Sequence, residues 1–148
     1  MKAEPVATSS VFLYYICNML KPENRLKKVR DFNLIIKNGR WERGRFIDLK
    51  YLELAKIKEL FPKKEDTNEF ANQLKIAFSV GVKLAKSSVK RNRIRRQMRE
   101  VVRLLVKEGA IRGGCFLLFL AKKGSLEKNY AEISQEIDLI LRKTRMTK

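Results

Sequence analysis

Residues 89–107 constrain the fold most, because they combine an apolar stripe with an almost entirely basic opposite side. The stripe consists of Ile94, Met98, Val101 and Leu105, spaced by four, three and four residues as on one side of an α-helix. At 1.5 Å per residue such a helix is about 28 Å long. Strand-like segments precede and follow it, so we expect the helix to pack on a sheet.

Two strands and a further helix are predicted around this element. Residues 74–82 (LKIAFSVGV) are typical of a strand, and the continuous apolar run 115–121 (CFLLFLA) is typical of a strand buried on both faces. Ser88 is a suitable N-cap for the helix between them, and Ser125 for a last helix. We expect the basic tail after that helix to be frayed from residue 142. The last helix is marked at helical spacing by Leu126, Tyr130, Ile133, Ile137 and Ile140.

The beginning of the chain predicts another amphipathic helix. Leu26, Val29, Phe32 and Ile36 recur at spacings of three, three and four, which places them on one face. Gly39 suits the C-terminal cap of this helix.

The segments between the first helix and residue 74 are less regular. Residues 40–44 indicate a turn, and residues 46–54 alternate as in a half-buried strand. Residues 52–60 either complete that strand or form a short helical turn, and the polar stretch 62–73 indicates a loop. The order of helices and strands therefore predicts a single α+β domain with helices on one mixed sheet.

Residues 1–18 are expected to be an N-terminal extension to a domain that spans 19–148. Their apolar run, residues 11–17, is far shorter than the roughly 20 residues that cross a bilayer. The extension is either a disordered segment, the product of a start codon upstream of Met19, a strand or staple added to the fold, or a targeting segment. We expect a cytoplasmic protein.

The basic side of the long helix indicates a polyanionic partner. The chain has 34 Lys and Arg against 16 Asp and Glu, a net charge of +18. Positions 86–99 hold seven cations and no acid. A face needed only for solubility mixes both signs, and the apolar side is too narrow for a membrane-surface helix. Arginine predominates, and its planar group binds phosphate oxygens in pairs, so nucleic acid is favoured. The seven cations are Lys86, Lys90, Arg91, Arg93, Arg95, Arg96 and Arg99.

The composition also excludes several kinds of catalytic site. There is no histidine, so a histidine-containing triad and histidine metal ligands are excluded. Cys17 and Cys115 are far apart and form no CxxC pair, which fits a reducing compartment. We expect no catalytic residue and no direct metal ligand.

Three stretches together resemble the bacterial ribonuclease P protein component. Residues 90–96 (KRNRIRR), with Phe78-Ser79-Val80 before them, are similar to the signature of that family. Residues 24–26 with Asp31-Phe32 are similar to its N-terminal motif, and residues 115–124 (CFLLFLAKKG) fall where the family has its last strand. The resemblance covers residues 19–143.

The resemblance implies a fold and a function. The fold has the order α-β-β-β-α-β-α, with helices on a mixed four-stranded sheet, as in the second domain of ribosomal protein S5. The chain would be an accessory subunit of the endoribonuclease that matures the 5′ end of precursor tRNA. Its partners would be ribonuclease P RNA, which carries the catalysis and binds most of the Mg²⁺, and precursor tRNA. Neither a membrane nor a small-molecule substrate is implied.

The resemblance also implies two binding surfaces. One docks on the catalytic RNA, with Asn92 near RNA-bound metal ions. The other is a cleft between the first helix and the sheet that holds the single-stranded 5′ leader. The RNA-binding residues are Lys86, Lys90, Arg91, Asn92, Arg93, Arg95, Arg96 and Arg99. The cleft residues are Phe32, Ile36, Lys50, Ser79 and Lys83.

This chain departs from the family pattern in three ways. Ile36 stands where a second cleft aromatic is usual, the strand aromatic corresponds to either Lys50 or Tyr51, and the segment 56–73 is longer than usual. The residues alone also leave two other functions open. These are a non-enzymatic RNA-binding protein, such as a ribosomal protein, and a protein-only nuclease, which the lack of histidine disfavours.

Overall fold

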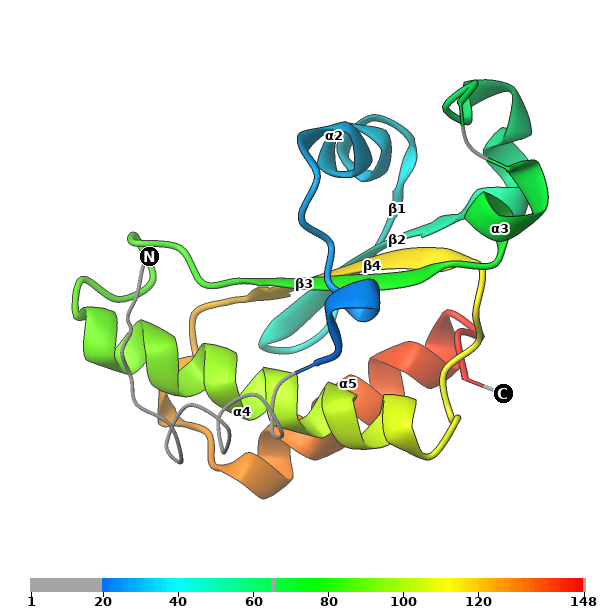
Figure 1. The fold of residues 1–148 in the computed structure, drawn as a ribbon. Helices are drawn as coiled ribbons and strands as arrows, with labels where there is room; N and C mark the ends of the chain where they lie inside the picture. Colours follow the sequence, from blue (N-terminus) through cyan, green and yellow to red (C-terminus); the bar gives the residue numbers. More distant parts are fainter. Residues whose placement is uncertain (1–19, 65, 148) are drawn as a thin grey trace, which may run out of the picture.

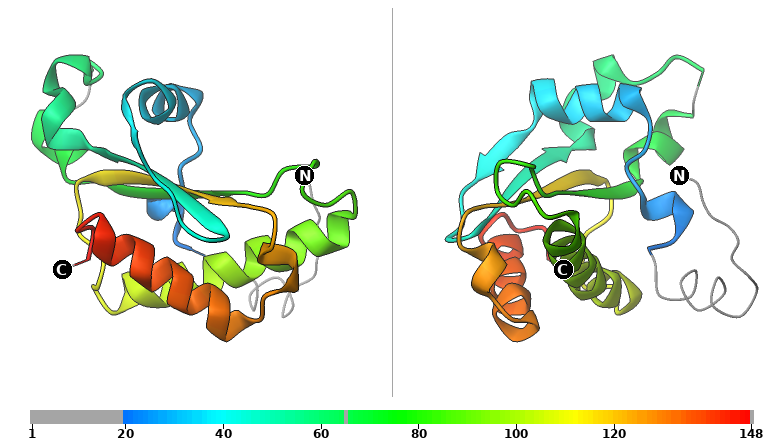
Figure 2. Two further views of the ribbon diagram at one scale, coloured as in Figure 1. Left: turned by 180° about the vertical axis from the view of Figure 1, so that it is seen from behind. Right: turned by 90° about the vertical axis from the view of Figure 1, so that its left-hand side faces the viewer.

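Two layers of helices enclose one mixed sheet in residues 20–64 and 66–147, the part of the chain that the computed structural model describes. The four strands lie in the order β1-β2-β4-β3, antiparallel except for the parallel pair β3–β4. Helices α4 and α5 cover one face of the sheet and α2 lies over the other (Figures 1 and 2). The expected α+β fold with a mixed four-stranded sheet is confirmed.

The bounds of the elements follow the chain in this order. The helices are α2 (Val29–Asn38), α3 (Thr67–Ala71), α4 (Ser88–Lys107) and α5 (Tyr130–Lys143). The strands are β1 (Arg40–Glu42), β2 (Ile47–Glu53), β3 (Leu74–Ser79) and β4 (Cys115–Ala121). Short 3₁₀ segments are η1 (Pro22–Asn24), η2 (Leu54–Leu60) and η3 (Ser125–Glu127).

The core has two parts, one on each face of the sheet. Ile94 and Met98 of α4 pack with Ile137 of α5 against the sheet, and all three are fully buried. Phe116 of β4 belongs to the opposite cluster together with Ile35 of α2. Strand β4 thus lies between both clusters, which confirms that its apolar run is buried on both faces.

Both predicted helix caps were wrong by a few residues. The side chain of Ser87, not Ser88, accepts the hydrogen bond that caps α4. Ser125 lies in η3, and α5 is capped by Asn129, which forms a reciprocal capping box with Glu132. The helical spacing identifies the helices, but it does not show which residue in front of each helix has the extended backbone of an N-cap.

The end of the chain is packed rather than frayed as far as residue 147. Arg142 and Lys143 complete α5, and the side chain of Met146 is fully buried in the main cluster. Thr147 pairs with Ile111 in an isolated antiparallel bridge. The positive charge of residues 142–148 led to the prediction of fraying, whereas the burial of Met146 holds this segment on the core.

Two short elements replace predicted irregular segments. Residues 40–44 are not simply a turn, because Arg40–Glu42 forms β1 by pairing with β2. Within 62–73, α3 is capped by the carboxylate of Asp66 and buries Phe70. After β2 the chain forms η2, which settles the open alternative for 52–60 in favour of helical turns. Elements this short depend on tertiary pairing and show no periodicity.

The predicted half-burial of β2 was also wrong. Leu52, on the side expected to face solvent, belongs to the cluster under α2. Asp48 on the same side is buried, in contact with Arg43 and Lys122. Strand β3 ends at Ser79, three residues before the predicted end at residue 82.

Helix α2 leaves part of the predicted apolar stripe exposed. Val29 and Ile36 are 74% and 55% exposed, whereas Asp31 and Ile35 are buried. Asp31 is paired with Lys75 of β3 at 3.6 Å between Oδ2 and Nζ. The spacing of apolar residues reveals a stripe, but it does not show whether the stripe faces the core or the solvent.

Candidate nucleic-acid interface

Four arginines gather on the exposed side of α4 and form what we call the arginine cluster: Arg25, Arg95, Arg96 and Arg99. Burial lowers the pKa of the half-buried Arg99, and the positive charges of Arg95, Arg25 and Arg96 lower it further. Arg25 reaches this place because it forms a parallel bridge with Ile76 of β3. An anion placed there would relieve the mutual repulsion of the four charges.

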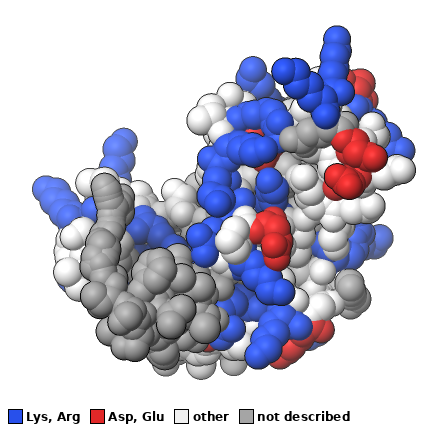
Figure 3. All heavy atoms as spheres, viewed as in Figure 1, with Lys and Arg blue, Asp and Glu red and all other residues white. Residues whose placement is uncertain are grey.

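The fold supplies no counter-charge for the predicted RNA-binding cations. Among residues 20–64 and 66–147, none of the seven cations of positions 86–99 is ion-paired with an acidic side chain. Arg103, one turn beyond Arg99, is bound by both carboxylate oxygens of Glu100 at 2.9 and 2.7 Å. On the part of this face that Figure 3 leaves visible, Lys and Arg side chains outnumber acidic ones.

Two of the predicted cations hold neighbouring backbone rather than standing free. The Nη1 group of Arg91 donates to the carbonyls of Ala85 and Lys86 at 2.7 and 3.0 Å. The Nη2 group of Arg93 donates to the carbonyl of Leu126 in η3 at 2.7 Å. Both side chains therefore fix the segments on either side of α4, and each has further donors for a partner.

The remaining predicted residues of this surface are exposed or face the arginine cluster. Asn92 is exposed, and its side-chain oxygen accepts a hydrogen bond from Arg95 at 2.8 Å. Lys86 and Lys90 are exposed at the start of α4. The structure thus brings Arg95, Arg96 and Arg99 together and adds Arg25, which the sequence reasoning did not place in the site.

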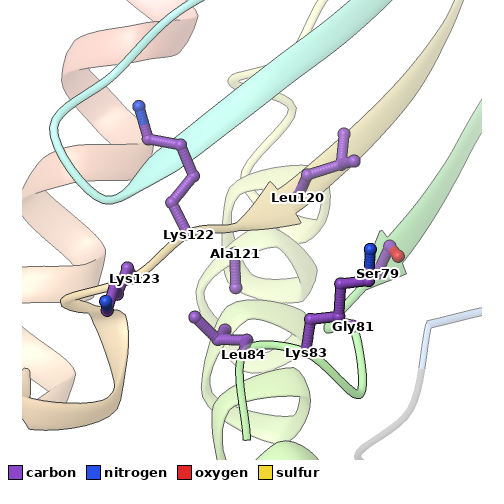
Figure 4. Close-up of a pocket in the computed structure, with 8 residues that line it drawn as sticks. All are labelled: Ser79, Gly81, Lys83, Leu84, Leu120, Ala121, Lys122 and Lys123. Carbon is purple, nitrogen blue, oxygen red and sulfur yellow. The ribbon is translucent and has the colours of Figure 1, made fainter.

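At one end of the sheet, β3 and β4 finish beside an open hollow of about 650 Å³ (Figure 4). Ser79 and Lys83, two predicted cleft residues, line it. Lys122 and Lys123 also line it but were not predicted, although the Lys-Lys-Gly after the last strand marked them. In Figure 3 the outline of the molecule is notched between α2 and the start of α4. The other lining residues are Gly81, Leu84, Leu120 and Ala121.

The other predicted cleft residues lie on α2 and β2, outside this hollow. Phe32 is half-buried against the cluster under α2, and Ile36 is exposed. Lys50 donates from Nζ to the carbonyl of Ile36 at 2.8 Å, so it ties β2 to the end of α2. Together with Val29, Phe32 and Ile36 form an apolar stripe along α2 that the sheet leaves largely uncovered.

Trp41 is a surface aromatic that the sequence reasoning missed. It lies in the edge strand β1 opposite Lys50, and its side chain is 41% exposed. The Cζ atom of Arg43 lies 4.4 Å from the centroid of the indole ring, and Nζ of Lys50 lies 5.1 Å from it. The signal was the only tryptophan of the chain, within a segment that was interpreted as a turn.

The buried acid Asp48 closes the turn between β1 and β2. It accepts hydrogen bonds from the backbone of Gly44 and from Arg43, each at 3.0 Å, and pairs with Lys122 at 3.1 Å. Burial alone would raise the pKa of Asp48, but these donors lower the pKa below its ordinary value. Asp48 is therefore an ionised structural group.

A second buried acid, Glu136 of α5, holds the same turn from the other side. One of its oxygens accepts the backbone N–H groups of Arg45 and Phe46, the latter at 3.1 Å. A side chain at Gly44 would place its Cβ 2.2 Å from the carbonyl oxygen of Ile47, so this position requires glycine. Neither buried acid has a place in a catalytic pair.

The described residues offer little to a metal ion or a nucleophile. In residues 20–64 and 66–147, no three His, Cys, Asp or Glu side chains lie together as metal ligands. Burial raises the pKa of Cys115 to about 12, so its thiol is protonated. No helix in the described part is long and apolar enough to cross a membrane.

Comparison with known proteins decides the family. A family model described as Ribonuclease P matches residues 20–145. The chain belongs to the ribonuclease P protein family. The ribonuclease P protein component of a Synechococcus species is 30% identical over 125 residues, which are 84% of either chain. That of Alkaliphilus metalliredigens is 28% identical over 86% of this chain and 98% of its own.

Solved structures of this family share the fold. The Staphylococcus aureus RNase P protein superimposes with a TM-score of 0.64, at 21% identity, over 84% of this chain and 98% of its own. The RNase P protein of Thermotoga maritima gives a TM-score of 0.60 at 19% identity, over 80% and 96%. Both likenesses confirm the α+β architecture expected from the sequence.

Proposed function

We propose that this chain is the protein subunit of ribonuclease P and assists endonucleolytic removal of the 5′ leader from precursor tRNA (EC 3.1.26.5). The observation that carries the proposal is the arginine cluster, whose four charges have no acidic partner in the described fold. Family membership points to ribonuclease P RNA as the polyanion that fits it. In this proposal catalysis belongs to the RNA subunit, as membership of the family implies.

Two surfaces of the protein bind two different RNA molecules. The α4 face, from Lys86 to Arg99, docks on the catalytic RNA, and Asn92 lies near metal ions that the RNA holds. The α2 face, with Phe32, and the hollow at Ser79 take the single-stranded leader. Mg²⁺ is bound mainly by the RNA subunit, and the reaction takes place in the cytoplasm.

Reconstitution tests this proposal. The protein is mixed at low magnesium with a bacterial ribonuclease P RNA and precursor tRNAs that differ in leader length. We expect faster cleavage than with the RNA alone, a gain that depends on the leader, and no cleavage by the protein alone. No gain, together with co-sedimentation with ribosomes, would instead identify a ribosomal type of RNA-binding protein.

Matched variants make the test specific. Replacing Arg95 and Arg99 by glutamine should abolish most of the gain, because both contribute to the cluster without an acidic partner. Arg103→Gln is the control on the same helix, since Glu100 already neutralises Arg103. Equal losses in both variants would argue against docking through the cluster.

A further inference from the structure

Trp41 lies at a place where a hydrophobic side chain contributes little to stability. Strand β1 is the edge of the sheet and is only three residues long. Trp41 belongs to neither buried cluster and is 41% exposed. Large aromatic side chains usually lie in the core or on a binding surface, so the position of Trp41 indicates a binding surface.

The surroundings of the indole ring are cationic. The guanidinium of Arg43 lies over the ring at 4.4 Å and is itself 66% exposed, with one N–H group on the buried Asp48. Lys50 is at 5.1 Å from the ring. Indole and guanidinium planes are the two surfaces on which unpaired nucleic acid bases stack, and the two cations add attraction for the phosphate.

The strand register connects this place with the part of the sheet that lies under α2. Trp41 is opposite Lys50, Lys50 is opposite Leu118 of β4, and Leu118 is opposite Ala77 of β3. Adjacent strands are about 4.8 Å apart, so this row crosses the sheet over about 14 Å. Lys50 also binds the last turn of α2 through the carbonyl of Ile36. The indole ring therefore lies at the edge of the sheet, next to the lysine that binds the end of α2.

We propose that Trp41 and Arg43 form a stacking subsite for one unpaired RNA base, with Lys50 and Arg43 facing its phosphate. This inference rests on the proposed function, since it extends the single-stranded track beyond the α2 stripe to the edge of the sheet. The base comes from the leader of the substrate or from an unpaired nucleotide of the catalytic RNA.

Trp41 is the only tryptophan of the chain, so intrinsic fluorescence reports on the subsite directly. We expect oligouridylates of increasing length to quench the fluorescence of the full-length protein once they are long enough to reach β1. Measured by filter binding, because this variant has no tryptophan to quench, Trp41→Ala should weaken binding of these oligonucleotides by roughly 5- to 150-fold. Trp41→Phe should keep most of the affinity, whereas Trp41→Leu, which is apolar but cannot stack, should not. Leu139→Ala on α5 is the control, because Leu139 is similarly exposed.

Two further titrations identify the source of the base. Quenching on addition of ribonuclease P RNA alone assigns the base to the catalytic RNA. Quenching only when precursor tRNA joins the complex assigns it to the leader. Unchanged fluorescence in all titrations, or full binding by Trp41→Leu, would overturn the subsite. If cleavage is still stimulated in that case, the proposed function stands without it, and quenching without stimulation would reject the function alone.

Discussion

Cations gather at two places in this fold, and the chain supplies the counter-charge at only one of them. In the turn between β1 and β2, Arg43 and Lys122 are bound by the buried Asp48. In the arginine cluster, neither Arg95 nor Arg99 is ion-paired with an acidic side chain among the described residues, and Arg95 donates to the amide oxygen of Asn92.

Charges that have a buried counter-ion stabilise the fold, whereas charges without one are available to a polyanionic partner. A buried carboxylate with several donors contributes much less stability once one of its partners is removed. Clustered like charges destabilise the free protein and gain energy only when a polyanion arrives. Substitutions in the turn should therefore change stability, and those in the cluster should change RNA binding.

The largest effect is expected in the turn. Glu136→Ala leaves two backbone N–H groups without their acceptor, which should cost about 3 kcal/mol of the free energy of unfolding, measured in urea. Gln135→Ala, exposed on the same helix, is the control and should change little. If both variants are equally stable, the hydrogen bonds of Glu136 do not stabilise the turn.

The cluster should give the next largest effect, on RNA binding. Arg95→Gln and Arg99→Gln each remove a charge and should weaken binding to ribonuclease P RNA roughly 10- to 100-fold. The slope of log affinity against log salt should fall by about 0.7–0.9 for each phosphate that the variant protein no longer binds. Filter binding at several salt concentrations measures both. A slope equal to that of the wild type would exclude phosphate binding by these side chains.

Acid should weaken the turn. The pKa of Asp48 is lower in the folded than in the unfolded chain, so its stabilisation is present above the ordinary value of 3.8. It is lost as the pH falls through the lower folded value. Asp48→Asn should cost about 1 kcal/mol at pH 7 and flatten the fall in stability on acidification. Asp138→Asn, which breaks an exposed pair with Arg142, should leave the acid profile as it is.

The smallest effect should be a gain. Arg99→Met removes a half-buried charge from three like charges and keeps an unbranched stem, so the free protein should become more stable by about 0.5 kcal/mol. Thermal unfolding with and without RNA measures this change. The gain should disappear when RNA is bound. A decrease in the stability of the free protein would show that Arg99 has a structural partner after all.

The sequence predicted the elements whose hydrophobic pattern is continuous over many residues. The stripe from Ile94 to Leu105 is confirmed in α4, and the apolar run from Cys115 to Ala121 is confirmed in β4. The family resemblance is confirmed as well. The assigned roles of the cation and cleft residues stay predictions.

What could not be predicted depends on contacts between distant segments. β1 exists because β2 pairs with it, and α3 is stabilised by burial of Phe70. Arg25 enters the cluster only through its bridge to β3. Asp31 faces inward, where it is paired with Lys75 of another element, and Ile36 faces outward. None of these relations has a periodicity that a linear pattern can show.

The hydrogen bonds of Arg91 to Ala85 and Lys86 have a mechanical consequence. They join the segment after β3, which carries Lys83, to the first turn of α4. These bonds hold the rim of the hollow against the start of the cationic helix. In the proposed function, they therefore fix the distance between the segment that takes the leader and the helix face that docks on the catalytic RNA.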